Sequence, residues 1–142
     1  MKSMQNIFLL SAYEIKAKDF FEKLLFEKAD LVLDVRLRNT NQLCGFTKEN
    51  DLSFFIPQLT GAVYIHDLEF APTKELLNMY MKRNITWEQY AEQYEKLMAE
   101  RDVAARYRNK YGKYHSVCLL GTGTKKRRSH NEALVKILNR FE

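Results

Sequence analysis

Short apolar runs alternate along the chain with longer segments in which apolar residues recur three or four positions apart. The short runs predict buried strands, and the longer segments predict amphipathic helices with one apolar face. The predicted strands cover residues 7–10, 31–35, 62–66 and 115–120. The predicted helices cover residues 17–28, 49–59, 74–82, 87–110 and 131–141, with Phe141 among the buried residues of the last one.

Local signals refine the ends of two helices. Thr47 is predicted to cap the helix that begins near Glu49, and Pro57 to distort the end of that helix. Thr86 and Gln89 have the spacing of a capping box, in which each side chain bonds to the other residue's backbone N–H. A helix is therefore expected to start directly after Thr86.

The regular alternation of strands and helices predicts an α/β fold in a single domain of 142 residues. We expect a mainly parallel sheet of about four strands, joined by right-handed crossovers, with helices on both faces. All strands of a parallel sheet end on the same edge, so polar residues that follow different strands gather there. The residues expected at this edge are Asp34, Arg36, His66, Asp67 and the segment 121–131. The carboxyl edge of the sheet is therefore the predicted functional site.

The composition is that of a globular protein, with 46% hydrophobic and 29% charged residues. No apolar run approaches the roughly 20 residues that span a bilayer, and the first apolar run is shorter than the about 7–15 residues of a secretory signal. Two cysteines, Cys44 and Cys118, do not make a disulfide framework. These features predict a cytoplasmic protein that does not interact with membranes.

Positive charge is concentrated at the C-terminal end of the chain. Residues 101–142 hold eleven Lys or Arg and three Asp or Glu, whereas residues 1–100 hold twelve and fifteen. This asymmetry predicts an anionic partner, either a phosphorylated small molecule, a nucleic acid or an acidic protein. A solvated basic face without a partner explains the same pattern. Nothing in the sequence indicates the oligomeric state.

Four motifs occur in the order and spacing of a known family. They are Asp34-Val35-Arg36, Phe46-Thr47-Lys48, Tyr64-Ile65-His66 and Trp87-Glu88-Gln89-Tyr90, with Tyr94 matching as well. With these motifs the chain resembles a bacterial and archaeal family known as domain of unknown function 488, over about residues 7 to 138. The resemblance implies a small α/β domain with a site at these motifs, and it implies no particular reaction.

The chain departs from the family pattern near its C-terminal end. Members usually have Cys-Ala-Glu at the end of a strand and Cys-His-Arg at the start of the next helix. Here Gly121-Thr122-Gly123 and Ser129-His130-Asn131 occupy these places, so only His130 is retained. Asn39 also replaces a proline that is common in the family. Chemistry that needs a thiolate cannot be transferred to this chain, which is either a branch with altered chemistry or one that has lost activity.

The glycine-rich segment after the fourth predicted strand is a candidate anion site. Backbone N–H groups of Gly121, Thr122, Gly123 and Thr124 are in a position to surround an anion, and Lys125 begins a run of four cations. A flexible loop between strand and helix is the alternative interpretation. The segment lacks the Walker pattern, so neither nucleotide triphosphate hydrolysis nor a cofactor is predicted.

The residues that open the last helix have structural as well as functional interpretations. Ser129 and Glu132 have the spacing of a capping box, which we favour over a nucleophilic role for Ser129. His130 has a side chain that titrates near neutral pH and is a candidate acid/base group or phosphate ligand, or an exposed helix residue.

Two pairs of polar residues end the second and third predicted strands. Asp34 and Arg36 are expected either to form a structural ion pair or to position the guanidinium for an anion. His66 and Asp67 are expected to orient one another. The three histidines have no regular spacing and no clustered cysteines, so no metal site is predicted.

The favoured hypothesis is a small enzyme, or former enzyme, that binds a phosphorylated or nucleotide-like ligand at the carboxyl edge. Its candidate acid/base groups are Asp34, His66 and His130. Its candidate ligand-binding residues are Arg36, Lys48, Tyr64, Gly121, Thr122, Gly123, Thr124, Lys125, Ser129 and Asn131. In this hypothesis, replacing Arg36 with alanine abolishes ligand binding and leaves the fold intact.

The alternative hypothesis is a nucleic-acid-binding module that uses the basic residues 101–142. It predicts an affinity that falls steeply as the salt concentration rises. A role in protein interaction, after loss of an ancestral activity, is a third hypothesis.

Overall fold

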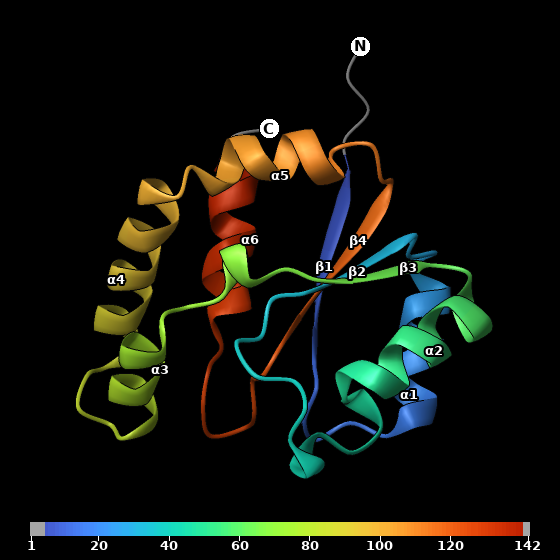
Figure 1. Ribbon diagram of the computed structural model, residues 1–142, viewed down its shortest axis with the longest axis horizontal. Coiled ribbons are helices and arrows are strands. Elements are labelled where there is room, and N and C mark those ends of the chain that lie inside the picture. The colour runs from blue at the N-terminus through green and yellow to red at the C-terminus, as the bar shows by residue number, and fades with distance from the viewer. Residues whose placement is uncertain (1–4, 141–142) are drawn as a thin grey trace.

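The computed structural model describes residues 5–140, apart from the side chains of residues 42 and 43 (Figure 1). Its strands are β1 (Asn6–Ser11), β2 (Leu31–Asp34), β3 (Val63–His66) and β4 (Ser116–Gly121). Its α-helices are α1 (Ala17–Phe26), α2 (Glu49–Thr60), α3 (Lys74–Met81), α4 (Trp87–Glu100), α5 (Val103–Tyr111) and α6 (His130–Arg140). Two short 3₁₀ segments are η1 (Gln42–Thr47) and η2 (Leu68–Phe70). The predicted α/β fold is confirmed, and Phe141 lies outside the described residues.

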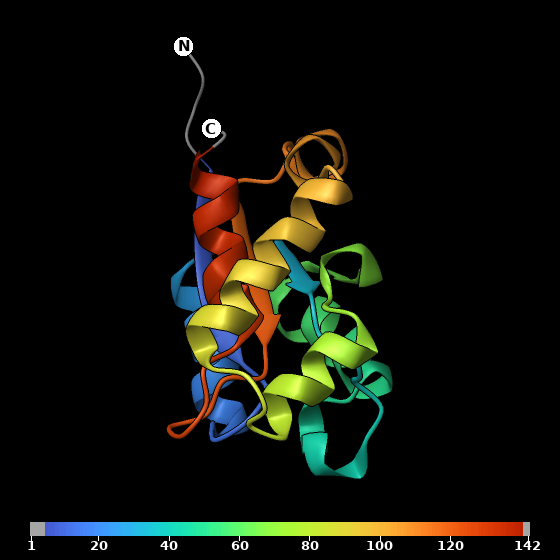
Figure 2. The same ribbon diagram turned by 90° about the vertical axis from the view of Figure 1, so that its left-hand side faces the viewer.

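The four strands form one parallel sheet in the order β1-β4-β2-β3. The connections through α1 and α2 move in one direction along the sheet and cover one face of it. The connection through α3, α4 and α5 returns in the opposite direction over the other face, where α6 also packs (Figures 1 and 2). Crossovers of the same handedness that run in opposite directions along a sheet lie on opposite faces of it. The sheet is therefore covered by helices on both faces, as predicted.

Alternate residues of the central strands supply two separate hydrophobic cores. Leu33 and Leu119 point into the core beneath α3–α6, whereas Val32 and Leu120 point into the core beneath α1 and α2. All four side chains are fully buried, and such a residue stabilises the fold by about 1.5–3 kcal/mol. Because β2 and β4 are packed on both faces, the positions of their carboxyl ends are fixed by the cores.

The single helix predicted over residues 87–110 is wrong, because the chain breaks it into α4 and α5. Asp102 has a left-handed backbone (φ 54°), and the chain then turns so that Val103 and Tyr107 enter the core. Arg101 holds the break, donating from Nη1 to the carbonyl oxygens of Glu69 and Ala71 at 2.8 Å each. These are tertiary contacts, so the apolar periodicity of the segment does not reveal the break.

The predicted helix-end signals have mixed outcomes. The capping box of Thr86 and Gln89 is confirmed, with both of its hydrogen bonds formed. Thr47 does not cap α2, because its hydroxyl donates to the carbonyl oxygen of Cys44 and the residue before the helix is Lys48. Pro57 lies inside α2, which continues for three further residues.

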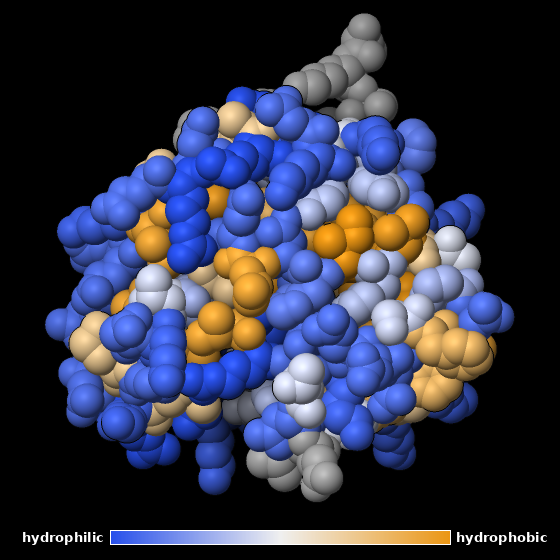
Figure 3. Space-filling model, in the orientation of Figure 1, coloured by the Kyte–Doolittle hydropathy of each residue, from blue (hydrophilic) through white to orange (hydrophobic). Residues whose placement is uncertain are grey.

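The carboxyl ends of β1 and β4 point toward the lower side of the molecule in Figure 1, and those of β2 and β3 lie farther left, near mid-height. The lower side of the surface is largely hydrophilic in Figure 3, whereas apolar patches lie mainly at mid-height. Across residues 5–140 no helix combines the length and the apolar character that crossing a membrane requires. The surface at the carboxyl ends of β1 and β4 is thus polar.

Candidate functional site

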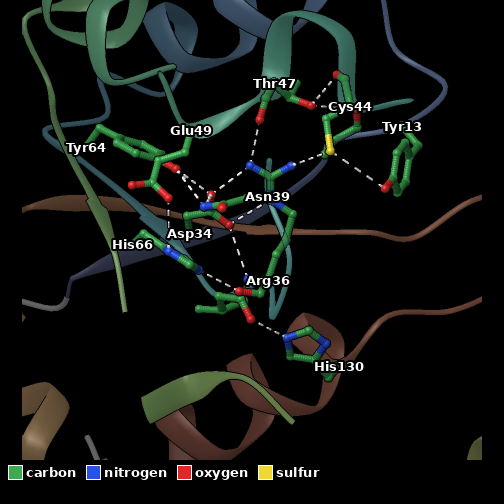
Figure 4. A network of polar contacts seen from close by, with 12 residues as sticks. Tyr13, Asp34, Arg36, Asn39, Cys44, Thr47, Glu49, Tyr64, His66 and His130 are labelled. Carbon is green, nitrogen blue, oxygen red and sulfur yellow. Dashed lines mark hydrogen bonds and ion pairs between the residues drawn. The ribbon is translucent and has the colours of Figure 1, made fainter. Parts of the chain in front are cut away.

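Asp34 and Arg36 form a buried ion pair at the carboxyl end of β2 (Figure 4). Side chains two residues apart in an extended chain lie on the same side, and this places the guanidinium beside the carboxylate. Arg36 Nε lies 2.8 Å from Asp34 Oδ1, and Nη2 lies 2.7 Å from Oδ2. Both side chains are completely inaccessible to solvent. This is the bidentate geometry in which Arg binds a carboxylate most strongly.

The remaining polar atoms of the pair are bonded to β3 and to the segment that follows β2. Tyr64 Oη and Asn39 Nδ2 donate to Asp34 Oδ2 at 2.5 and 3.1 Å. Arg36 donates from Nη2 to the carbonyl oxygen of Thr47 at 2.7 Å and from Nη1 toward Cys44 Sγ at 3.7 Å. The pair is therefore a structural clamp that fastens β3 and the segment between β2 and α2 to the end of β2.

Electrostatics keep Asp34 ionised and Tyr64 protonated. Burial by itself raises the pKa of Asp34, but the hydrogen bonds and charge of Arg36, with Tyr64 and Asn39, outweigh burial and lower this pKa below its ordinary value. Burial and the neighbouring carboxylate both raise the pKa of Tyr64. Asp34 is thus a saturated carboxylate whose lone pairs are engaged, and it is not placed to act as a base.

Two histidines hold the backbone carbonyl groups next to the ion pair. His130 Nε2 lies 2.6 Å from the carbonyl oxygen of Val35, and His66 Nε2 lies 2.7 Å from that of Arg36. A carbonyl oxygen only accepts, so Nε2 carries the hydrogen in both rings. The Nδ1 atom of His66 faces the Glu49 carboxylate at 3.5 Å. Histidines from β3 and α6 therefore fix two consecutive peptide groups at the end of β2.

His130 is neutral at physiological pH. It is 3% exposed, beside the Tyr94 ring at a centroid distance of 5.3 Å. Burial lowers its pKa to about 4, although the Val35 carbonyl and the Asp34 charge favour the protonated form. The ring is therefore a neutral hydrogen-bond donor inside the protein.

The three candidate acid/base groups lie together, as the parallel topology predicted. Asp34 and His130 are buried, and His66 is 17% exposed with its Nε2 committed to a backbone carbonyl. The prediction that His66 and Asp67 orient one another is wrong. Asp67 Oδ2 accepts from the Tyr111 hydroxyl at 2.5 Å, because successive strand residues face opposite sides of the sheet.

The start of α6 packs against the last residue of β4. Asn131 Nδ2 donates to the carbonyl oxygens of Leu119 and Leu10 at 3.0 and 3.3 Å and so joins α6 to both strands. A Cβ atom on Gly121 would lie 2.6 Å from Asn131 Cγ and 2.7 Å from Ser129 Oγ. Glycine at position 121 is therefore needed for this close contact.

One prediction about this loop is wrong, and another stays a prediction. The Ser129 hydroxyl accepts from the backbone N–H of Thr122 at 3.1 Å, and only the Ser129 carbonyl accepts from Glu132, so the capping box is not formed. The N–H groups of Thr124 and Lys125 donate to the Arg127 carbonyl and to Glu14 Oε1. These two N–H groups are used within the protein, and anion binding by the segment from Gly121 to Thr124 stays a prediction.

An open part of the rim lies beside β1. After β1 the chain leaves toward the face of α1, and after β4 it leaves toward the face of α6. Ligands of parallel sheets bind at such points of divergence. A hollow of about 380 Å³ lies here. Its lining residues are Leu9, Leu10, Ser11, Tyr13, Glu14, Gly123, Thr124, Lys125, Asn131 and Glu132.

The candidate ligand-binding residues are thus divided between two places. Gly123, Thr124, Lys125 and Asn131 line the hollow, and Gly121, Thr122 and Ser129 lie directly behind it. Arg36 and Tyr64 belong to the buried network, and Lys48 precedes α2, outside the residues that line the hollow. Among residues 5–140, no group of three or more His, Cys, Asp or Glu side chains is arranged to hold a metal ion.

Sequence reasoning missed several residues of the network and of the hollow. Asn39, in an irregular segment, contacts Asp34, and Glu49, on α2, contacts His66. Tyr13 and Glu14 line the hollow. The only sequence signal for Tyr13 and Glu14 was their place directly after a predicted strand. Nothing in the local pattern identified Asn39 or Glu49.

The fold and the rim are those of a small α/β domain built on a parallel four-stranded sheet. The model of the family described as Domain of unknown function DUF488 matches residues 16–138, and the chain belongs to that family. The curated proteins and the solved structures gave no match. The resemblance seen in the sequence motifs is therefore confirmed, and the function is to be argued from the site.

We expect Arg36→Ala to destabilise the fold by about 3–5 kcal/mol, because it leaves the Asp34 carboxylate buried without its partner. This replaces the expectation that the fold survives the substitution. Denaturant unfolding of this variant and of the control Arg38→Ala, which changes an exposed arginine, measures the difference. Equal stability of the two variants would contradict a structural role for the pair.

Gly121→Ala is expected to lower the free energy of unfolding by about 1–3 kcal/mol, because the new methyl group overlaps Asn131 and Ser129. Gly123→Ala is the matched control, since its nearest neighbour would lie at 3.7 Å. Thermal unfolding of both variants compares them. If Gly123→Ala were the more harmful change, the described packing of α6 on β4 would be wrong.

The stability of the protein is expected to fall on acidification between about pH 6.5 and pH 4. The pKa of His130 is lower in the folded protein than in the unfolded chain, so the unfolded chain binds the proton first as the pH falls. The loss is about 2 kcal/mol between pH 7 and pH 5. The pKa of Asp34 is lowered in the folded protein. This side chain therefore adds to the loss of stability only below about pH 3.9, the usual pKa of an aspartate in an unfolded chain.

Urea unfolding at pH 7, 6 and 5 measures this dependence in the wild type and in His130→Gln. The glutamine amide keeps a donor for the Val35 carbonyl but does not titrate. The variant is expected to lose the pH dependence, and an unchanged slope would show that His130 is not its source.

Proposed function

We propose that this domain binds a phosphate-bearing small molecule in the hollow beside β1. The observation that carries the proposal is the position of the hollow, at the point where the chain segments after β1 and β4 diverge to opposite faces. A volume of about 380 Å³ lies within the usual range of small-molecule sites.

The chemistry of the walls supports an anionic group on the ligand. Lys125 lines the hollow, and Lys126 and Arg127 follow it in the same loop. None of the three has a carboxylate within ion-pair distance among residues 5–140. Pairing of β1 with β4 uses alternate N–H groups, so those of Leu9 and Ser11 face the open edge of the sheet. Cations and free backbone donors on two sides of one hollow are suited to a phosphate.

The proposal is a binding function rather than acid/base catalysis by Asp34, His66 and His130. These three side chains are engaged in the buried network and do not line the hollow.

We place the protein in the cytoplasm, because Cys44 and Cys118 are both buried free thiols.

The distribution of cations favours a small ligand over a nucleic acid. Several basic side chains of the C-terminal third are neutralised, as in the pairs Arg106–Glu69, Lys110–Asp67 and Arg140–Glu95. Lys113, at the amino end of β4, and Lys136, on α6, carry no ion pair but lie outside the run 125–127. The described cations of the C-terminal third are thus divided between paired side chains and separate positions, which favours a small ligand over a phosphate backbone.

Thermal-shift measurements with inorganic pyrophosphate and a ribonucleoside 5′-monophosphate test the proposal. A ligand at a hundred times its dissociation constant stabilises the protein by about 2.7 kcal/mol, which raises Tm by roughly 5–10 °C for a chain of this size. The double variant Lys125→Ala/Lys126→Ala is expected to lose most of this shift, whereas Lys136→Ala retains it.

A shift that the double variant leaves unchanged would contradict the proposal, as would the absence of a shift with both compounds. A shift obtained only with an oligonucleotide, and falling steeply as salt rises, would support the nucleic-acid alternative instead.

A further inference from the structure

The walls of the hollow carry negative as well as positive charge. Two carboxylates, those of Glu14 and Glu132, line it together with Lys125. A ligand that presented only phosphate oxygens would face both carboxylates, and like charges repel. The ligand that fits must therefore combine an anionic group with hydrogen-bond donors.

Both carboxylates retain an oxygen for a ligand. Glu14 Oε1 accepts from the backbone N–H of Lys125 at 2.7 Å. Glu132 Oε1 accepts from Arg128 Nε and Nη2 at 3.1 and 2.9 Å. In both side chains these contacts use Oε1, so the Oε2 atoms are left without a partner among residues 5–140. The positions are fixed, because Lys125 and Arg128 belong to the loop that forms one side of the hollow.

The other walls suit a flat, partly apolar group. Leu9 and Leu10 contribute apolar surface, and Tyr13 contributes an aromatic ring. The Tyr13 hydroxyl lies 3.9 Å from Cys44 Sγ, so the ring is anchored at its polar end (Figure 4). Aromatic side chains stack on nucleobases of any sequence because every base has a π-face.

We infer that the ligand of the hollow is a ribonucleotide, an inference that rests on the proposed function. Carboxylates accept hydrogen bonds from the hydroxyls of a ribose, as an acidic residue does in dinucleotide-binding sheets. Glu14 and Glu132 take the ribose hydroxyls, Tyr13 lies against the base, and Lys125 holds the phosphate, with Lys126 next to it in the loop. The mixed charge of the hollow then selects a ribonucleotide over inorganic phosphates.

Isothermal titration of the full chain with the four ribonucleoside 5′-monophosphates, their 2′-deoxy counterparts and pyrophosphate tests this inference. The wild type is expected to bind the best ribonucleotide about tenfold more tightly than its deoxy counterpart, since one buried hydrogen bond is lost. Glu14→Gln removes the charge but keeps an amide oxygen for the Lys125 N–H. It is expected to weaken ribonucleotide binding about tenfold and to strengthen pyrophosphate binding.

Glu75→Gln, which changes an exposed carboxylate on α3, is the matched control and is expected to alter neither affinity. Phosphate binding without a preference for ribose, or a loss of affinity for pyrophosphate in Glu14→Gln, would overturn the ribonucleotide inference and leave the proposed phosphate site standing. Failure of all these compounds to bind would overturn both.

Discussion

The buried pair of Asp34 and Arg36 is the interaction on which the arrangement of the rim depends. Two ions with no solvent contact are tolerated only because every polar atom around them is engaged. Their partners come from β3, from the segment before α2 and, through the neighbouring carbonyl groups, from α6. Elements distant in sequence are thus held in register at one point, and the carboxyl ends of β2, β3 and β4 become a rigid, closed surface.

This closure divides the rim into two parts with different properties. Over β2 and β3 the polar side chains face one another, so residues that look catalytic in the sequence have structural roles. Beside β1 the sheet has an open edge, and the loop after β4 is held by Asn131, Ser129 and Glu14 without filling the space. A rigid frame next to an open hollow is an arrangement suited to a ligand that binds with little rearrangement.

The sequence predicted most of the fold because each strand and helix has a clear period and because crossover handedness restricts the topology. It also predicted that Asp34, His66 and His130 meet, since parallel strands end on one edge. It did not predict the break between α4 and α5 or the burial of Arg36, because both depend on contacts between distant segments such as Arg101 with η2. The same limit applies to Glu14, whose role follows from the loop packed beside it and not from its neighbours in sequence.

Backbone amide NMR during a titration with a ribonucleoside 5′-monophosphate tests the central claim most directly, because it locates the ligand residue by residue. The account predicts shifts concentrated at Leu9, Ser11 and residues 123–125, with the amides of residues 34–36 nearly unchanged. Shifts centred on Asp34, Arg36 and His66 would contradict it, because they would place the ligand at the closed part of the rim.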